Sequence, residues 1–407
     1  MRWLRSQAAS LLPFLALLWM ALPQSAQAQV RLDARAGSID LWPSVSILRN
    51  AAPGLDATAA ALAARDAFTA PQSAHATLGF AEPFIWMRIP VVNPAAAPAT
   101  RVLTFDYALL HFVDVTLAAG GTLQTLPRVG NKVARAERPI AGRNHALEIV
   151  FPPGASELLI RVESPGSKIL PMFLSTWPAY HRGELIETMV QGLLASLALW
   201  LLFYSLLQWR VLQEALYLKY GLLIVASALF SIHFFGIGEQ YLWGDHHWIE
   251  NHLAGLSALM ASCATALFVE DALRADSPPV LSKALLALAG LMALCALAHA
   301  LDWIGIREVG VVMGSLGLLP VVLGTPGAVR RLKRGDAVGG WFLLAWTGYL
   351  IGSAVMVGVV KGSVGANFWT LHSFQAAATI DMLIFMQIAV IGTRRIKEEL
   401  AAERRQF

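Results

Sequence analysis

Two groups of polar residues stand out in a chain that is otherwise strongly hydrophobic. The first is a short run rich in histidine and carboxylate side chains, made up of Glu239, Asp245, His246, His247, Glu250 and His252. Imidazoles and carboxylates bind metal ions, and neutral histidines titrate near pH 6.5. His246, His247 and His252 are therefore weak metal-ligand candidates, although their spacing matches no specific coordination motif. A solvated loop at a membrane surface is the plainer interpretation, because several aromatic residues occur in the same run.

The second group lies inside an apolar run near the end of the chain. Asp381 stands near the middle of residues 368–392, and His372 and Gln375 precede it by nine and six residues. A carboxylate in the middle of a membrane helix costs roughly 2.5–3.5 kcal/mol, so Asp381 should face other helices, be paired or be protonated. We expect the three residues to act in helix packing or signal transmission. A structural hydrogen bond and the movement of protons or ions are the alternatives.

No catalytic signature accompanies these groups. The chain has no HExxH zinc motif, phosphate-binding loop, GxSxG elbow or CxxC pair. We therefore predict no catalytic residues, no cofactor and no enzymatic module. Trp86 and Arg88, in a β-rich segment, are weak ligand-binding candidates, and a charge on a strand face is the simpler interpretation of Arg88. Glu270 and Asp271 are expected at a solvated helix end.

A membrane-embedded bundle must position most of these residues. The chain has 407 residues, of which 56% are hydrophobic and 14% are charged, whereas soluble chains carry about 25% charged residues. Residues 185–392 consist of hydrophobic runs of about 20 residues, the length of a helix that crosses a ~30 Å hydrocarbon core. Seven transmembrane helices are predicted, at 187–209, 215–236, 252–273, 283–303, 308–328, 338–360 and 368–392. Pro320 should kink the fifth.

Basic residues give the orientation of this seven-helix bundle. The predicted inner connections and the tail contain Arg210, Arg274, Lys283, Arg330, Arg331, Lys333, Arg334, Arg394, Arg395 and Lys397. The predicted outer connections contain only Arg307 and Lys361. By the positive-inside rule, the N-terminal region lies outside and the C-terminus in the cytoplasm. Because the net charge of +4 gathers at membrane edges, nucleic acid is not expected as a partner and the lipid bilayer is.

The N-terminal part has a different composition from the bundle. Residues 1–28 are typical of a signal peptide, with Arg2 and Arg5, an apolar stretch and a small-x-small cleavage site. Residues 29–184 contain no cysteine and should form a periplasmic all-β sandwich without disulfides. A short helix is expected at 57–67. The predicted strands are 84–92, 101–107, 112–117, 145–151, 157–162 and 169–175. Of these, the strand at 157–162 should be buried on both faces.

The remaining residues, 393–407, form a short charged tail. Its composition favours a helix, and Ile396 and Leu400 stand four residues apart, at the spacing with which a heptad seam begins. We expect the tail to be a cytoplasmic helix that starts a coiled coil and carries the signal. A frayed, charged helix end is the alternative interpretation.

The order of several short motifs resembles bacterial seven-transmembrane receptors with diverse intracellular signalling modules. In the outer region these motifs are Gly79-Phe80, Phe84-Ile85-Trp86-Met87-Arg88, Val92-Asn93-Pro94, Arg161-Val162-Glu163-Ser164 and Leu170-Pro171-Met172-Phe173-Leu174. In the bundle they are Tyr217-Leu218-Lys219-Tyr220, Gln240-Tyr241-Leu242-Trp243 and the acidic Asp381. The resemblance implies a jelly-roll outer domain with a carbohydrate-like or other small ligand. It also implies a seventh helix that drives an output module, often a diguanylate cyclase or histidine kinase.

These observations lead to the expectation of a sensory receptor in a bacterial inner membrane. The outer domain would bind a small molecule or a periplasmic protein. The printed chain ends at Phe407, where the family's output module would begin, so a cytoplasmic signalling enzyme acting in trans, or a shortened gene product, is expected. A homodimer remains open. The alternatives are a transporter or channel subunit, and an accessory membrane subunit of a separate kinase or cyclase.

Overall fold

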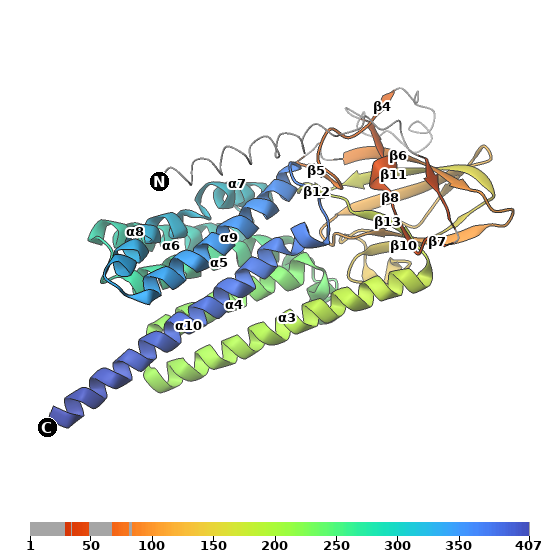
Figure 1. Cartoon of the computed structure of the whole chain (residues 1–407). Helices are drawn as coiled ribbons and strands as arrows, with labels where there is room; N and C mark the ends of the chain where they lie inside the picture. The colour runs from red at the N-terminus through yellow and green to blue at the C-terminus, as the bar shows by residue number, and fades with distance from the viewer. Residues whose placement is uncertain (1–28, 34, 49–66, 81–83, 407) are drawn as a thin grey trace, which may run out of the picture.

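The computed structural model describes two connected parts, a β domain and a helical bundle (Figure 1). It covers residues 29–33, 35–48, 67–80 and 84–406, with the backbone alone at 389 and 392–406. The predicted signal peptide, residues 1–28, and residues 57–66 of the short helix expected at 57–67 lie outside the described residues.

The strands of the β domain occur where short alternating segments predict them. In His145–Phe151, for example, Leu147 and Ile149 are buried while Glu148 and Val150 point to solvent, as a strand with one covered face requires. The strands are β1 (Val30–Arg31), β2 (Ser38–Asp40), β3 (Ser46–Leu48), β4 (Phe68–Thr69), β5 (Thr77–Gly79), β6 (Phe84–Asn93), β7 (Ala99–Phe105), β8 (Phe112–Ala119), β9 (Thr122–Thr125), β10 (His145–Phe151), β11 (Gly154–Glu163), β12 (Lys168–Ile169) and β13 (Met172–Ser175).

These strands form a sandwich, as predicted. Within the described residues, the larger sheet has the order β4-β3-β6-β11-β8-β9, with β1 added to β6 in parallel, and the second has the order β10-β7-β13-β2. Met87 and Ile160 from the first sheet share one core with Phe105 and Leu147 from the second. The segment 169–175 is divided into β12 and β13, because Pro171 has no N–H for a ladder.

Strand β11 lies at the centre of the larger sheet, between β6 and β8. Its consecutive apolar residues Leu158, Leu159 and Ile160 are all fully buried. The prediction that this strand is covered on both faces is therefore confirmed.

Long helices follow the sandwich with almost no linker. They are α3 (Trp177–Leu212), α4 (Ala215–Phe234), α5 (His247–Leu273), α6 (Pro279–Ala300), α7 (Ile306–Leu316), α8 (Leu319–Lys333), α9 (Ala337–Lys361) and α10 (Phe368–Gln406). Among the described residues, six segments have the length and hydropathy of membrane spans, with α7 and α8 counted as one. Helix α10 is not among those six but packs along α9.

The fifth predicted span is interrupted rather than continuous. Helix α7 ends at Leu316, and α8 begins at Leu319 with Pro320 in its first turn. A proline is tolerated there because the first helical N–H groups have no intrahelical acceptor. Pro320 thus separates two helices instead of kinking one.

Helices α3 and α10 are much longer than a membrane requires. With 36 and 39 residues, they extend about 54 and 58 Å at 1.5 Å per residue, against a ~30 Å hydrocarbon core. Figure 1 shows α3 running from the sandwich along the bundle, and the C-terminal end of α10 projecting beyond the other helices. Both helices therefore connect regions outside the membrane.

Candidate signal-transmission site

One hydrophobic core runs from the β domain into the bundle. Phe234 and Phe235, at the end of α4, belong to the same buried cluster as Leu103 and Phe105 of the sandwich, and so does Leu371 of α10. The β domain therefore covers Phe234 and Phe235.

Two glycines bring the backbones of the two parts into contact. Gly236 follows α4 with φ +73°, and a Cβ there would lie 2.0 Å from the carbonyl oxygen of Arg143. Gly79 has φ +64°, and a Cβ there would lie 2.6 Å from the carbonyl oxygen of Lys361. Only glycine combines this backbone conformation with so close an approach. The β domain is thus seated directly on α4 and α9.

Buried ion pairs join the same surfaces. The guanidinium of Arg143 lies 2.7 Å from Asp106 in the β domain and 3.2 Å from Glu184 on α3. Burial would lower the pKa of Arg143, but the carboxylates of Asp106, Glu184 and Glu187 raise it above its usual range. Arg143 is therefore a fixed positive charge held between the β domain and α3.

The polar run after α4 also belongs to this junction. Glu239 is buried and pairs with the guanidinium of Arg138 from the β domain, while Asp245 accepts a hydrogen bond from the backbone N–H of Arg135 at 3.0 Å. The expectation of a solvated loop is wrong at Glu239 and also at Glu250, which is 8% exposed and accepts a hydrogen bond from Nε1 of Trp243. The β domain replaces water over this part of the run.

The three histidine metal candidates do not come together. His246 and His247 are exposed, whereas His252 is buried, 2.9 Å from Asp302, with Trp248 stacked on its ring. In the described part of the chain, no group of three histidine, cysteine or carboxylate residues could hold a metal ion.

His372 and Gln375 of α10 are brought together with two residues of α3. Nε2 of His372 lies 2.9 Å from Oε1 of Glu187. The amides of Gln191 and Gln375 exchange two hydrogen bonds, of 3.2 and 2.8 Å. Gln191 also donates to Glu187 at 2.9 Å. We call these four residues the α3–α10 polar pair set.

Both ring nitrogens of His372 have close polar partners. Nδ1 lies 2.7 Å from the carbonyl oxygen of Phe368, and Nε2 faces the carboxylate of Glu187. Nε2 also lies 3.4 Å from the amide nitrogen of Gln191, so the ring contacts both α3 residues of this set. The ring stacks on Phe235 with the centroids 4.4 Å apart, and the tilted ring of Phe368 lies 4.2 Å away.

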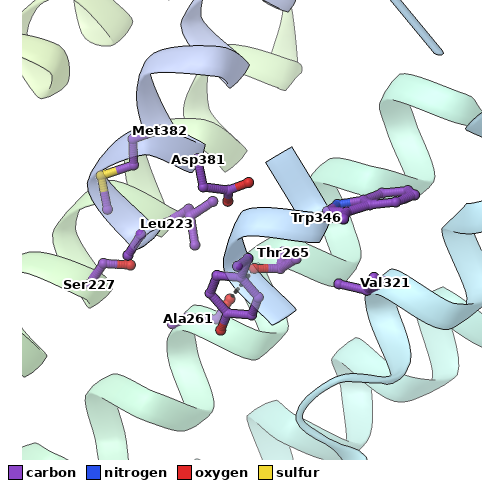
Figure 2. A pocket seen from close by; sticks show the side chains of 10 residues that line it. Leu223, Ser227, Ala261, Thr265, Val321, Trp346, Asp381 and Met382 are labelled. Carbon is purple, nitrogen blue, oxygen red and sulfur yellow. Dashed lines mark hydrogen bonds between the residues drawn. The ribbon is translucent and has the colours of Figure 1, made fainter. Parts of the chain in front are cut away.

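Asp381 lies elsewhere, in the middle of the bundle. It lines a cavity of about 10 Å³ between α4, α5, α8, α9 and α10, about the smallest space that holds a water molecule. Figure 2 shows its carboxylate among Leu223, Thr265 and Trp346. Among the described residues, neither Oδ1 of Asp381 nor Nε1 of Trp346 has a hydrogen-bond partner. An acceptor and a donor thus border the same small cavity unpaired.

The remaining candidates occupy less distinctive positions. Trp86 and Arg88 on β6 are buried, and Arg88 lies 3.4 Å from Glu157 and over the ring of Phe68. These positions favour strand packing over ligand contact. Ile396 and Leu400 lie in the helical backbone of α10, as expected.

The solvated helix end expected at Glu270 is wrong. Its carboxylate is buried and accepts hydrogen bonds from Arg274 at 2.9 Å and Ser282 at 2.5 Å, because the start of α6 packs against the end of α5. Asp271 is partly exposed and pairs with Lys219 at 2.6 Å.

Comparison with protein families agrees with this architecture. A model described as "7TM diverse intracellular signalling" matches residues 187–390, half of the chain. A second, described as "7TMR-DISM extracellular 2", matches residues 43–176. The chain belongs to this receptor family. The receptor is therefore a multi-pass membrane protein with an extracellular sensory domain. No curated protein matches its sequence.

Sequence reasoning did not identify the partners of His372 and Gln375. Glu184, Glu187 and Gln191 recur at i, i+3 and i+7 in the first helix, a spacing that places them along one helical face. This polar stripe in an otherwise apolar helix was the available signal. The pairing of Arg143 with Asp106 and Glu184 had no such signal, since it depends on how the sandwich sits on the bundle.

Proposed function

We propose that the receptor transmits the state of its β domain to the cytoplasm through α3 and α10. The β domain would lie in the periplasm of a bacterial inner membrane and bind a small molecule, carbohydrate-like or otherwise, or a protein partner. The tail of α10 would lie in the cytoplasm and act on a signalling enzyme such as a histidine kinase or diguanylate cyclase. The basic residues at the ends of α3 and α8 support this orientation.

The observation that carries the proposal is the chain of contacts at the junction. Arg143 links Asp106 of the β domain to Glu184 of α3, and one helical turn later Glu187 of α3 contacts His372 of α10. Because both helices extend beyond the membrane, a change in how the β domain sits shifts α3 against α10. A ligand has this effect only if it prefers one of the two arrangements.

A glycine substitution tests this route. Gly236→Ala places a methyl group against the carbonyl of Arg143 and should displace the β domain. The full-length receptor, with Cys263 and Cys295 replaced by Ala, would carry spin labels at residues 211 and 401 in lipid nanodiscs. We expect the distance distribution between the ends of α3 and α10 to shift.

Gly120→Ala is the matched control. Gly120 also has a positive φ, of +56°, but a Cβ there would meet nothing within 4 Å. Gly120→Ala therefore has a similar cost in backbone conformation, but its methyl group contacts no other part of the receptor. Equal label distances in the wild type and Gly236→Ala, with the β domain folded, would contradict transmission through this junction.

A further inference from the structure

A second cavity, of about 110 Å³, lies at the junction itself. The β domain contributes Asp106, Tyr107 and Arg143, α3 contributes Glu187, and α10 contributes His372. Engineered cavities of ~150 Å³ bind benzene, so this one has room for a molecule of a few non-hydrogen atoms. It is bordered by the same residues that connect the β domain to α3 and α10.

The cavity has an approach from solvent on one side. The side chain of Asp106 remains 34% exposed, and Phe368, at the first turn of α10, is 44% exposed. Asn367, which precedes α10, also lines the cavity and is exposed. A small molecule can therefore enter beside the start of α10 without passing through the membrane.

The charges around this cavity do not cancel. Two carboxylates, Asp106 and Glu187, line it together with the guanidinium of Arg143 and the imidazole of His372. A third carboxylate, Glu184, does not line the cavity but pairs with Arg143 at 3.2 Å. Three carboxylates around one guanidinium and one imidazole make acidic groups the more numerous. A carboxylate among apolar groups is costly unless a counter-charge lies close.

Aromatic side chains form much of the remaining wall. Tyr107, Phe173 and Phe234 border the cavity, in addition to the two rings that enclose His372. The faces of aromatic rings attract cations. Carboxylates in excess, together with aromatic walls, are complementary to an organic cation rather than to an anion or a neutral sugar.

We propose that this junction cavity is the receptor's ligand site and that it takes a small monovalent organic cation of the amine class. The ammonium group would lie near Asp106 and Glu187, and its alkyl part against Phe234 and Phe173. This inference rests on the proposed function, because the bound cation would act by holding the β domain, α3 and α10 in one arrangement.

Three probes of similar size and different charge test the charge preference: ethylammonium, acetamide and acetate. Binding to the full-length receptor in nanodiscs would be measured by saturation-transfer NMR and by the shift of the thermal midpoint at constant ionic strength. A ligand of three non-hydrogen atoms binds with a dissociation constant of about 1 mM at best, so titrations extend to about 100 mM. Ethylammonium should bind, and acetamide and acetate should bind at least tenfold more weakly.

Two substitutions should change the affinity for ethylammonium in opposite directions. Asp106→Asn removes one negative charge from the cavity and should weaken binding about tenfold, as one close charge interaction is worth about one factor of ten. Asn367→Asp adds a negative charge and should strengthen binding several-fold. It also keeps the cap on α10, since the side chain of Asn367 accepts a hydrogen bond from the N–H of Thr370 at 3.1 Å. Asp33→Asn, an exposed charge change outside the cavity, is the control.

Each outcome of these titrations bears on one of the two proposals. Equal binding of all three probes, or weaker ethylammonium binding in Asn367→Asp, would overturn the cation site. If ethylammonium fails to bind while Gly236→Ala still moves the label at residue 401, transmission stands and the ligand chemistry is wrong. If ethylammonium binds but neither it nor Gly236→Ala moves that label, the cation site stands and the proposed transmission fails.

Discussion

At the scale of single residues, the polar side chains of α10 have separate surroundings. His372 and Gln375 contact α3, whereas Asp381 lies in a cavity with α4, α5 and α9. Nine residues at 100° per residue place Asp381 on the opposite side of the helix from His372. Asp381 therefore cannot extend the α3–α10 polar pair set, and a role in transmission has to pass through the centre of the bundle.

Substitution of Asp381 should separate function from stability. A buried carboxylate oxygen without a partner costs free energy, so Asp381→Leu should leave the β domain folded and raise the free energy of unfolding by about 1–2 kcal/mol. Asp381→Asn should have a smaller effect. Denaturant unfolding of both variants in nanodiscs, with the 211–401 label distance as readout, checks this. A loss of more than 1 kcal/mol in Asp381→Leu would show instead that the carboxylate stabilises the fold.

At the scale of elements, α3 and α10 are held together by few but specific contacts. The Gln191–Gln375 amide pair lies about one turn of α3 further along the helix than the Glu187–His372 pair. Both pairs lie near the end of the bundle that carries the β domain. The rest of α10 packs on α9, where Gly352 allows close approach to Ala377 and Ser373. The α3–α10 contact is thus the smaller of the two.

A double-mutant cycle measures this contact. Gln191→Leu and Gln375→Leu should each cost up to about 1.5 kcal/mol, because the remaining amide loses its partner. The double variant should recover much of that loss, with a coupling free energy of about 0.6–1.7 kcal/mol. Reversible unfolding of the four proteins gives the value. Strict additivity would mean that the two amides are not paired in the membrane.

At the scale of the whole molecule, the β domain and the bundle share a core and fold as one unit at the junction. Buried histidines make this unit sensitive to acid. His145 lies in the β domain with Nε2 3.0 Å from the carbonyl oxygen of Ala108. Burial, together with the charge of Arg138, lowers its pKa to about 3. For His111, burial and the nearby Lys132 and Lys168 lower the pKa to about 4.

Because these pKa values are lowered, the unfolded chain binds more protons than the folded one below about pH 6.5. The contribution of these neutral, buried histidines to the free energy of unfolding is fully present above pH 6.5. It is lost as the pH falls towards their folded-state pKa values, about 4 for His111 and about 3 for His145. From pH 7 to 5, His145 alone should reduce the free energy of unfolding by about 2 kcal/mol. His75 acts in the opposite sense, since its hydrogen bond to Asp40 raises its pKa, and its contribution is lost as the pH rises.

Unfolding of the full-length receptor at pH 7 and 5 tests the size and sign of this effect. The His145→Gln variant keeps an amide donor for the carbonyl of Ala108 but does not titrate, so its loss between the two pH values should be about 2 kcal/mol smaller. An unchanged pH dependence in that variant would exclude His145 as a source of the acid sensitivity.

The sequence by itself determined the membrane class, the order of the hydrophobic spans and the sandwich, because each follows from local patterns. The apolar run around Asp381 and the alternation in His145–Phe151 are examples. Only the tertiary structure decided which polar groups are paired. Glu187 and His372 lie 185 residues apart, and Arg138 and Glu239 lie 101 apart. Such contacts depend on how the sandwich sits on the helices. For the same reason, residues expected in water, such as Glu239, lie inside the junction where Gly236 lets the two backbones meet.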